Sequence, residues 1–349
     1  MKPDTFRNLI RNPLFWPCVT LTLLCAVNFY FNRGFFDIEI KDGHLYGSVI
    51  DILNRAAPLM LIAMGMTLVI ATRGIDISVG ATVAIAGAVA AAMIGGSLVI
   101  KDGVQTYVSN VPMPLAIAGA LGVALLCGLW NGLLVAGAGM QPIVATLILM
   151  VAGRGIAQLI TEGQIVTVYY EPFFFFGNGF LFGIPFSLYI VAVVLIILLL
   201  LIHRTALGLF IEAVGVNPVA SRFSGIQART LVFSVYAFCA VTAGIAALII
   251  TSNVKSADAN NAGLLMELDA ILAVALGGTS LAGGRFHMIG TLIGALIIQT
   301  LTYAIYSLGV PPEINMVVKA LVVFGVCVIQ SPALREILAK HAFRTREVA

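Results

Sequence analysis

Apolar runs separated by short polar segments extend along almost the whole chain of 349 residues. A helix needs about 20 residues to cross the hydrocarbon core of a membrane, and most of these runs approach that length. The expected spans are 14–31, 49–71, one that ends near residue 95, 114–136, 143–160, 187–202, 231–250, 289–308 and 310–329. Residues 268–276 add a shorter apolar segment. The pattern predicts an all-α polytopic membrane protein with about ten transmembrane helices.

Two glycine-rich polar breaks, at 72–80 and 277–285, interrupt this pattern. Asp76 and Ser78, in the first break, stand where the third helix would begin. One interpretation is ordinary N-capping of that helix. The other is a broken or re-entrant helix whose freed backbone lines a cavity. The sequence leaves both interpretations open.

Composition excludes a soluble protein. Hydrophobic residues make up 60% of the chain and charged residues 10%, with a mean hydropathy of +1.05. Soluble domains carry about 25% charged residues, so this chain has too few polar side chains to cover a soluble surface. We expect residues 1–349 to form a single transmembrane domain. The five cysteines lie apart in apolar runs without metal-ligand spacing, so we expect no metal site. The net charge of +3 is no evidence for a nucleic-acid partner.

Lysine and arginine residues indicate the orientation of the chain, because cytoplasmic loops are enriched in them. With both termini in the cytoplasm, the expected internal segments hold 12 of these residues and the expected external loops hold 4. The internal ones are Lys2, Arg7, Arg11, Arg73, Arg204, Arg222, Arg229, Arg285, Arg335, Lys340, Arg344 and Arg346, and the external ones are Arg33, Lys41, Lys101 and Lys255. Arg55, Arg154 and Lys319 remain at or within the membrane.

Arg154 lies inside the expected span 143–160, together with Thr146 and Gln158. Their spacing at multiples of four places all three side chains on one face of a helix. An arginine at this depth needs polar partners or water. It is therefore either a structural tie or part of a hydrated path, and we favour the tie.

The polar segment 203–229 separates two strongly apolar runs and lies on the cytoplasmic side in this orientation. We expect two short helices, 210–214 and 218–223, around a turn at 215–217, since Asn217 and Pro218 are typical of a helix start. Apolar side chains in the segment are expected to be exposed to the cytoplasm, namely Leu209, Phe210, Ile211, Ala213, Val214 and Val216. Exposed apolar residues with a charged rim favour a docking surface. The alternative is an interfacial helix that lies on lipid headgroups.

Three separated motifs resemble those of ABC sugar importer permeases of the ribose/xylose/arabinose type. They are EAVGVN at 212–217 with a closing SGI at 224–226, GIDISVG at 74–80, and LDA at 268–270 followed by GGTS and GGR within 277–285. The resemblance covers about residues 50–330. Residues 51–58 and 257–263 are most similar to the galactofuranose-importing members of that family.

The resemblance implies a permease subunit that forms the path of a monosaccharide, galactofuranose-like or another sugar, across a bacterial inner membrane. A cytoplasmic ABC ATPase would bind and hydrolyse ATP–Mg, so this chain is expected to be no enzyme and to bind no cofactor. The absence of a Gly-x-x-x-x-Gly-Lys-[Ser/Thr] motif agrees with that expectation. Residues 251–267 are expected to form the most polar external loop. A periplasmic sugar-binding protein would deliver the sugar to the external loops, especially to residues 251–263. A second permease, identical or homologous, would enclose the path within the membrane lipid.

The same resemblance assigns expected roles to residues of this chain. The segment 203–229 would be the loop that couples the permease to the ATPase, through Glu212, Ala213, Gly215, Asn217, Ala220 and Gly225. Candidates for lining the path are polar groups at membrane depth, namely Asp76, Ser78, Asn131, Gln141, Thr146 and Gln299.

Two other functional classes are alternatives. An ion-coupled secondary transporter of a small polar solute would pair a carboxylate with a cation inside the membrane, and Asp76 with Arg154 is the obvious pair. Such a protein would work alone and without ATP. A membrane-embedded enzyme would need clustered His, Asp or Glu, whereas the four histidines are far apart in the sequence, at His44, His203, His287 and His341.

Overall fold

The computed structural model describes residues 14–41, 43–101 and 104–309, with a few single positions between 314 and 325. Six of its helices are long and apolar enough to cross a membrane. They are α3 (Ser48–Ala71), α5 (Met113–Gly132) with the π-helix η1 (Leu133–Gly137), α6 (Pro142–Ile160), α8 (Phe186–Arg204), α11 (Ala228–Val254) and α13 (Met288–Ser307). Shorter helices are α2 (Phe15–Phe31), α4 (Val79–Ile94), α9 (Leu207–Val216), α10 (Pro218–Phe223) and α12 (Met266–Leu276).

The polytopic, helical part of the expected fold is thus confirmed. The expected span 310–329 lies almost entirely outside the described residues, as do residues 1–13 and the basic C-terminal tail. The count of ten spans and the cytoplasmic termini therefore stay predictions.

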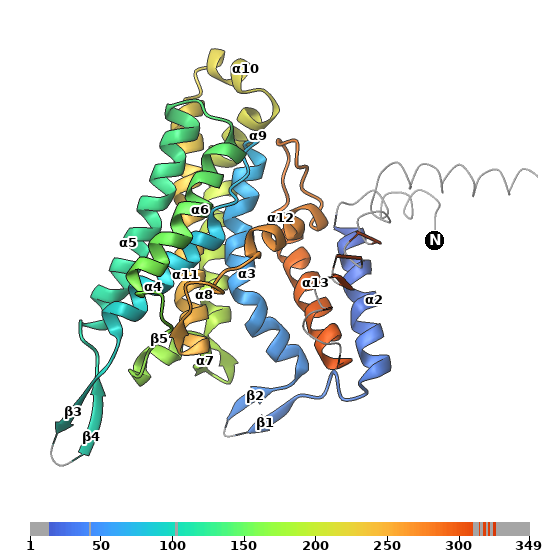
Figure 1. Ribbon diagram of the computed structural model, residues 1–349. Helices are drawn as coiled ribbons and strands as arrows, with labels where there is room; N and C mark the ends of the chain where they lie inside the picture. Colours follow the sequence, from blue (N-terminus) through green and yellow to red (C-terminus); the bar gives the residue numbers. More distant parts are fainter. Residues whose placement is uncertain are drawn as a thin grey trace, which may run out of the picture.

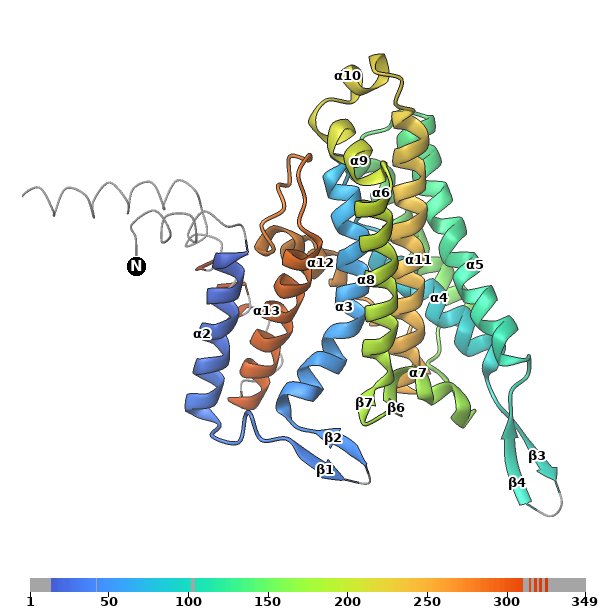
Figure 2. The same cartoon turned by 180° about the vertical axis from the view of Figure 1, so that it is seen from behind.

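Helix α3 is the centre of the bundle and packs against α8, α11, α12 and α13. Most of its length is buried, and small residues permit close helix contact. A side chain at Gly65, for example, would place its Cβ 2.8 Å from the Cα of Cys239 on α11. Helices α2 and α13 lie side by side on one flank of α3 (Figures 1 and 2).

Short antiparallel ribbons and a helical turn occupy the end of the bundle opposite α9 and α10 (Figure 1). The paired strands are β1 (Glu39–Lys41) with β2 (His44–Tyr46), β3 (Ser97–Lys101) with β4 (Val104–Val108), β5 (Val166–Thr167) with β8 (Ser256–Ala257), and β6 (Phe180–Leu181) with β7 (Ile184–Pro185). The turn consists of η2 (Glu171–Phe174) and α7 (Phe175–Asn178). The positive-inside pattern of the sequence predicts that 203–229 lies in the cytoplasm, so we call this end the external end and the opposite end the cytoplasmic end.

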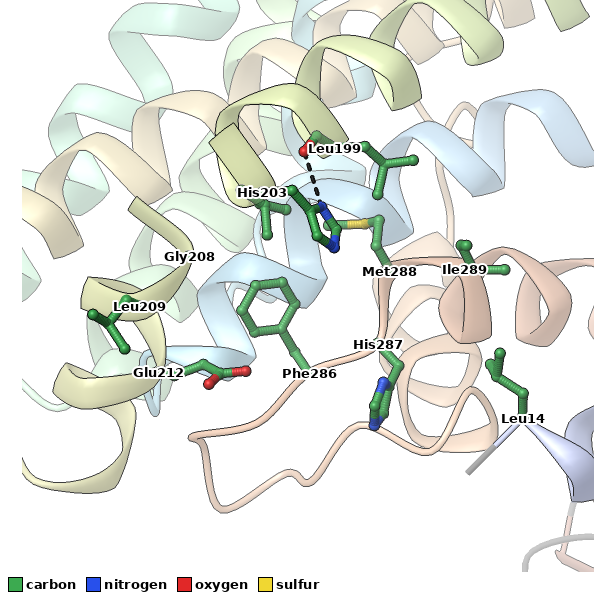
Figure 3. A pocket seen from close by; sticks show the side chains of 11 residues that line it. Leu14, Leu199, His203, Gly208, Leu209, Glu212, Phe286, His287, Met288 and Ile289 are labelled. Carbon is green, nitrogen blue, oxygen red and sulfur yellow. Dashed lines mark hydrogen bonds between the residues drawn. The ribbon is translucent and has the colours of Figure 1, made fainter. Parts of the chain in front are cut away.

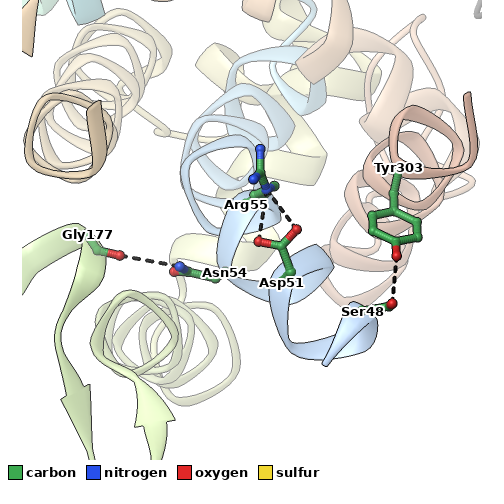
Figure 4. A network of polar contacts seen from close by, with 6 residues as sticks. All are labelled: Ser48, Asp51, Asn54, Arg55, Gly177 and Tyr303. Atoms are coloured by element: carbon green, nitrogen blue, oxygen red, sulfur yellow. Dashed lines mark hydrogen bonds and ion pairs between the residues drawn. The ribbon is translucent and has the colours of Figure 1, made fainter. Parts of the chain in front are cut away.

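Polar contacts hold the external end of α3 in place (Figure 4). The hydroxyl of Tyr303 on α13 donates to Ser48 Oγ at 2.6 Å, and Asn54 Nδ2 donates to the carbonyl of Gly177 in α7 at 3.3 Å. Arg55 Nε lies 2.9 Å from Asp51 in an exposed ion pair one helical turn apart. The end of α3 that enters the membrane from outside is therefore fixed to both α13 and α7.

The two polar breaks of the sequence are breaks in the helices. Helix α3 ends at Ala71 and α4 starts at Val79, while α12 ends at Leu276 and α13 starts at Met288. The segment between β8 and α12 leaves the external end and returns into the bundle, where Gly263 packs against Gly80 at the start of α4. The expected external loop 251–267 is thus wrong at both ends, because α11 continues to Val254 and residues 263–267 lie inside the bundle.

Candidate functional site

The polar segment at the cytoplasmic end folds into α9 and α10 between α8 and α11 (Figure 1). Asn217 separates the two short helices, and its Oδ1 accepts hydrogen bonds from the amides of Val219 and Ala220, each at 3.0 Å. Pro218 follows at the first helical position. The predicted helix start is confirmed, but the predicted turn at 215–217 is wrong. Residues 215 and 216 belong to α9, which is longer than the expected 210–214.

Helix α9 has a buried face and an exposed face. Ile211, Val214 and Gly215 are buried against the bundle, whereas Leu209 and Val216 are more than 60% exposed. The expectation that all the apolar side chains of this segment are exposed is therefore wrong for Ile211 and Val214. Their burial anchors α9 to the bundle and leaves other positions of the segment exposed.

Gly215 lies where α9 meets both broken helices. A Cβ at this position would overlap the carbonyl oxygen of Ala71 and lie 2.5 Å from the amide nitrogen of Gly284. That amide donates to the Ala71 carbonyl at 2.9 Å, so the end of α3 and the break after α12 are bonded to each other beneath α9. Segments carrying the three sequence motifs thus meet in one place.

Arg73 strengthens this junction. Its guanidinium donates to the carbonyl of Val216 at the end of α9, and its aliphatic part packs against Gly283. Gly283 has a φ of +85°, a conformation that favours glycine. Sequence analysis counted Arg73 only as an internal positive charge. Its position between the end of an apolar span and Gly74 was the sequence signal that could have identified it as a structural contact.

Asp76 is buried at the start of α4 within a cluster of hydrogen bonds. Its Oδ1 accepts from the amide of Ser78 at 2.9 Å and from the Ser78 hydroxyl at 2.7 Å. Asn131 Nδ2, from α5, donates to Ser78 Oγ at 2.7 Å. The interpretation of ordinary N-capping is wrong, because the N-cap residue Ser78 makes no side-chain cap hydrogen bond to α4. The Asp76 carboxylate instead holds Ser78 in the interruption between α3 and α4.

Thr146 and Tyr236 hold the backbone of the same break. The Thr146 hydroxyl, on α6, lies 3.3 Å from the amide of Ile77 and 3.4 Å from the carbonyl of Ile75. The Tyr236 hydroxyl, on α11, donates to that carbonyl at 3.5 Å. Sequence analysis missed Tyr236, because a tyrosine inside an apolar run carries no signal of a polar partner.

The structure brings four of the six path candidates together, namely Asp76, Ser78, Asn131 and Thr146. Gln141 is exposed just before the start of α6, and Gln299 is half-buried on α13. Within the described part of the chain, neither glutamine hydrogen-bonds to the Asp76 cluster.

Arg154 joins α6 to the segment that returns into the bundle. Its Nη1 donates to the carbonyls of Ala259 at 3.2 Å and Ala262 at 2.5 Å. Asp258 shapes the same segment by accepting the amide of Asn260 at 2.9 Å and the side chain of Asn261 at 2.7 Å. The Asn261 hydrogen bond is also the main reason why the pKa of Asp258 lies below its usual range.

Glu267 is a buried acid that sequence analysis assigned to an external loop. Only 3% of its surface is exposed, and its carboxyl packs against Gly80 at the start of α4. Its Oε2 has no hydrogen-bond partner among the described residues. An acid within the apolar run 264–276 was the signal for an intramembrane position.

In the described part of the chain, no group of three or more His, Cys, Asp or Glu residues could hold a metal ion. The contacts described above pack the short helix α9 against the ends of two interrupted helices, α3 and α12.

Comparison with known proteins places the chain among transport permeases. The family model described as branched-chain amino acid transport system / permease component matches residues 48–327. The chain is 50% identical over 321 residues to the galactofuranose transporter permease protein YtfT of Escherichia coli, an alignment that covers 90% of each chain.

Two further relatives align over most of both chains. The fructose import permease protein FruF of Bifidobacterium longum is 39% identical, over 95% of this chain and 92% of the relative. The ribose import permease protein RbsC of Escherichia coli is 36% identical, over 87% and 89%. No solved structure matches the chain. By the extent of these matches, the chain belongs to the permease-component family of branched-chain amino acid transport systems.

Proposed function

We propose that this chain is the permease subunit of an ATP-driven importer that carries a monosaccharide across a bacterial inner membrane. The proposal rests on the close packing of α9, at Gly215, against Ala71 and Gly284, which are hydrogen-bonded to each other. A cytoplasmic ATPase that displaced α9 would displace both broken helices with it.

The sugar class rests on the relatives. The names of the three relatives described above specify galactofuranose, fructose and ribose. Of these three, the galactofuranose permease has the highest sequence identity to this chain. A galactofuranose-like monosaccharide is therefore the cargo that we propose. A periplasmic sugar-binding protein would supply it at the external end, and a second permease would complete the path.

The mechanism follows from the contacts beneath α9. The ATPase would dock on the exposed part of 203–229, where Val219 and Phe223 of α10 are 64% and 89% exposed. Closure of the ATPase on ATP–Mg would move α9 as a rigid body, since its buried face is packed into the bundle. Through Arg73 and Gly284, that movement reaches the breaks before α4 and before α13. We propose that the polar groups around Asp76 then border the path that opens.

The contacts do not favour the alternative of an ion-coupled carrier. In the described part of the chain, Asp76 and Arg154 form no salt bridge with each other. Asp76 accepts from Ser78, whereas Arg154 donates to carbonyls of the segment after β8. Asp76 and Arg154 therefore have different hydrogen-bond partners and do not pair with each other.

The proposal is tested by reconstituting the chain with its ATPase, second permease and binding protein in liposomes. The measurement is ATP hydrolysis stimulated by the sugar-loaded binding protein. The double variant Val219→Asp/Phe223→Asp, on the exposed surface of α10, should lose this stimulation while remaining folded in detergent. Phe182→Asp, at the external end and 91% exposed, is the matched control and should keep it.

Unchanged stimulation in the double variant would show that α9 and α10 only lie on the lipid surface. Sugar transport by the native chain alone, driven by an ion gradient without ATP, would contradict the importer assignment altogether.

A further inference from the structure

A groove of about 390 Å³ lies at the cytoplasmic end, between the α8–α9 elbow and the start of α13 (Figure 3). Its walls are mainly apolar and include Leu199 on α8, Leu209 on α9 and Phe286 before α13. Helix α8 ends at Arg204, and it is apolar but only 17% buried, so we expect its exposed surface to lie against lipid. The groove therefore opens at the boundary between the hydrocarbon core and the headgroups.

Two hydrogen-bond acceptors line this apolar groove. Glu212 contributes its carboxylate from α9 (Figure 3). His203 Nδ1 lies 2.9 Å from the carbonyl oxygen of Leu199, which can only accept, so this ring nitrogen carries the hydrogen. In neutral His203, the other nitrogen, Nε2, is then an acceptor, and it points away from Leu199 (Figure 3).

We propose that the groove binds an aminophospholipid of the phosphatidylethanolamine class. Its primary ammonium carries one positive charge and three N–H donors, and a charge-assisted hydrogen bond to the Glu212 carboxylate would hold it in the groove. Nε2 of His203 offers a separate acceptor on the other side of Phe286 (Figure 3). The ring of His287 lies at the edge of the groove and can donate to the lipid phosphate. Acyl chains continue along the apolar walls to the lipid-facing surface of α8.

This assignment selects against other headgroups. A phosphatidylglycerol headgroup lacks a cation and places a net negative charge next to Glu212. A phosphatidylcholine headgroup has the same net charge as phosphatidylethanolamine, but its quaternary nitrogen has no N–H to donate. A comparison of these two zwitterionic lipids thus isolates the hydrogen bonds of the ammonium.

The test is lipid retention by the purified full-length chain, measured by native mass spectrometry after exchange into equimolar phosphatidylethanolamine and phosphatidylcholine with identical acyl chains. The native chain should retain phosphatidylethanolamine about tenfold better, the ratio expected from one charge-assisted hydrogen bond. Glu212→Gln preserves shape and should abolish the preference. Glu171→Gln, at the external end, is the matched control and should keep it.

A second variant tests the location of the lipid. Phe286→Trp adds volume inside the groove and should reduce retention of both lipids. Equal retention of the two lipids by the native chain, or an unchanged preference in Glu212→Gln, would overturn the proposal. Loss of the lipid from the native chain when the ATPase docks would assign the groove to a protein side chain instead, and would overturn it as well.

Discussion

Gly215 is enclosed by backbone atoms on the side that faces the bundle. A methyl group there would overlap the carbonyl of Ala71 and crowd the amide of Gly284, and both are backbone atoms that cannot move without shifting the chain. The sequence motif indicated that 215 matters for coupling, but it could not show the reason. The atoms in contact come from positions about 70 and 140 residues away.

Gly215→Ala should therefore destabilise the folded chain by about 1–3 kcal/mol, because overpacking forces backbone shifts. The measurement is the unfolding midpoint in detergent. Gly122→Ala, with open space at its Cβ, should leave the midpoint unchanged. Equal midpoints for the two variants would mean that α9 moves away from the bundle without cost.

Asp76 supplies the acceptor for Ser78, the residue just before α4, so Asp76→Ala should leave the Ser78 amide and hydroxyl without this partner. Buried donors that lose an acceptor cost about 1–3 kcal/mol, and the unfolding midpoint should fall accordingly. Asp37→Asn, at an exposed external position, serves as the control. A native-like midpoint for Asp76→Ala would show that water replaces the carboxylate without loss.

At the scale of the helices, hydropathy predicted the spans well and the breaks partly. The starts of α10 and α6 follow from Asn217–Pro218 and Gln141–Pro142, since proline favours the first helical position. The hairpins of the external end were not predicted, because a two- to five-residue strand has too short an alternation to detect. The return of residues 263–267 into the bundle depends on contact with Gly80, which no local pattern specifies.

Arg154 should control how firmly that returning segment is held. Arg154→Met removes the donor to the carbonyls of Ala259 and Ala262, so amides at 258–262 should exchange with deuterium faster. Arg154→Lys retains a charged donor and should give intermediate exchange. Protection identical to the native chain in Arg154→Met would show that the segment is held by other contacts.

For the whole molecule, the positive-inside pattern assigned α9 and α10 to one side and the hairpins to the other, and the structure places them at opposite ends of the bundle (Figures 1 and 2). Hydropathy could not predict which helix is central. Among the six long helices, α3 is the least apolar and the most buried, at 83%, whereas α8 is the most apolar and the least buried, at 17%.

The orientation is tested by single cysteines at Phe182, in the β6–β7 turn, and Phe223, at the end of α10, which are 91% and 89% exposed. A membrane-impermeant maleimide should label Phe182→Cys in right-side-out vesicles and Phe223→Cys only in inside-out vesicles. A chain in which the cysteines at 18, 25, 127, 239 and 327 are replaced provides the background. Labelling of both positions from the same side would contradict the topology.

The cap at Asn217 divides the cytoplasmic segment into a part that faces inward and a part that faces outward. Changes on the buried face of α9 affect the packing of the bundle, whereas the side chains of Val219 and Phe223 on α10 are exposed. Under the proposed function, the surface that recognises the ATPase could therefore evolve separately from the helices that move the cargo. Related permeases would then accept a different ATPase after changes within residues 218–223.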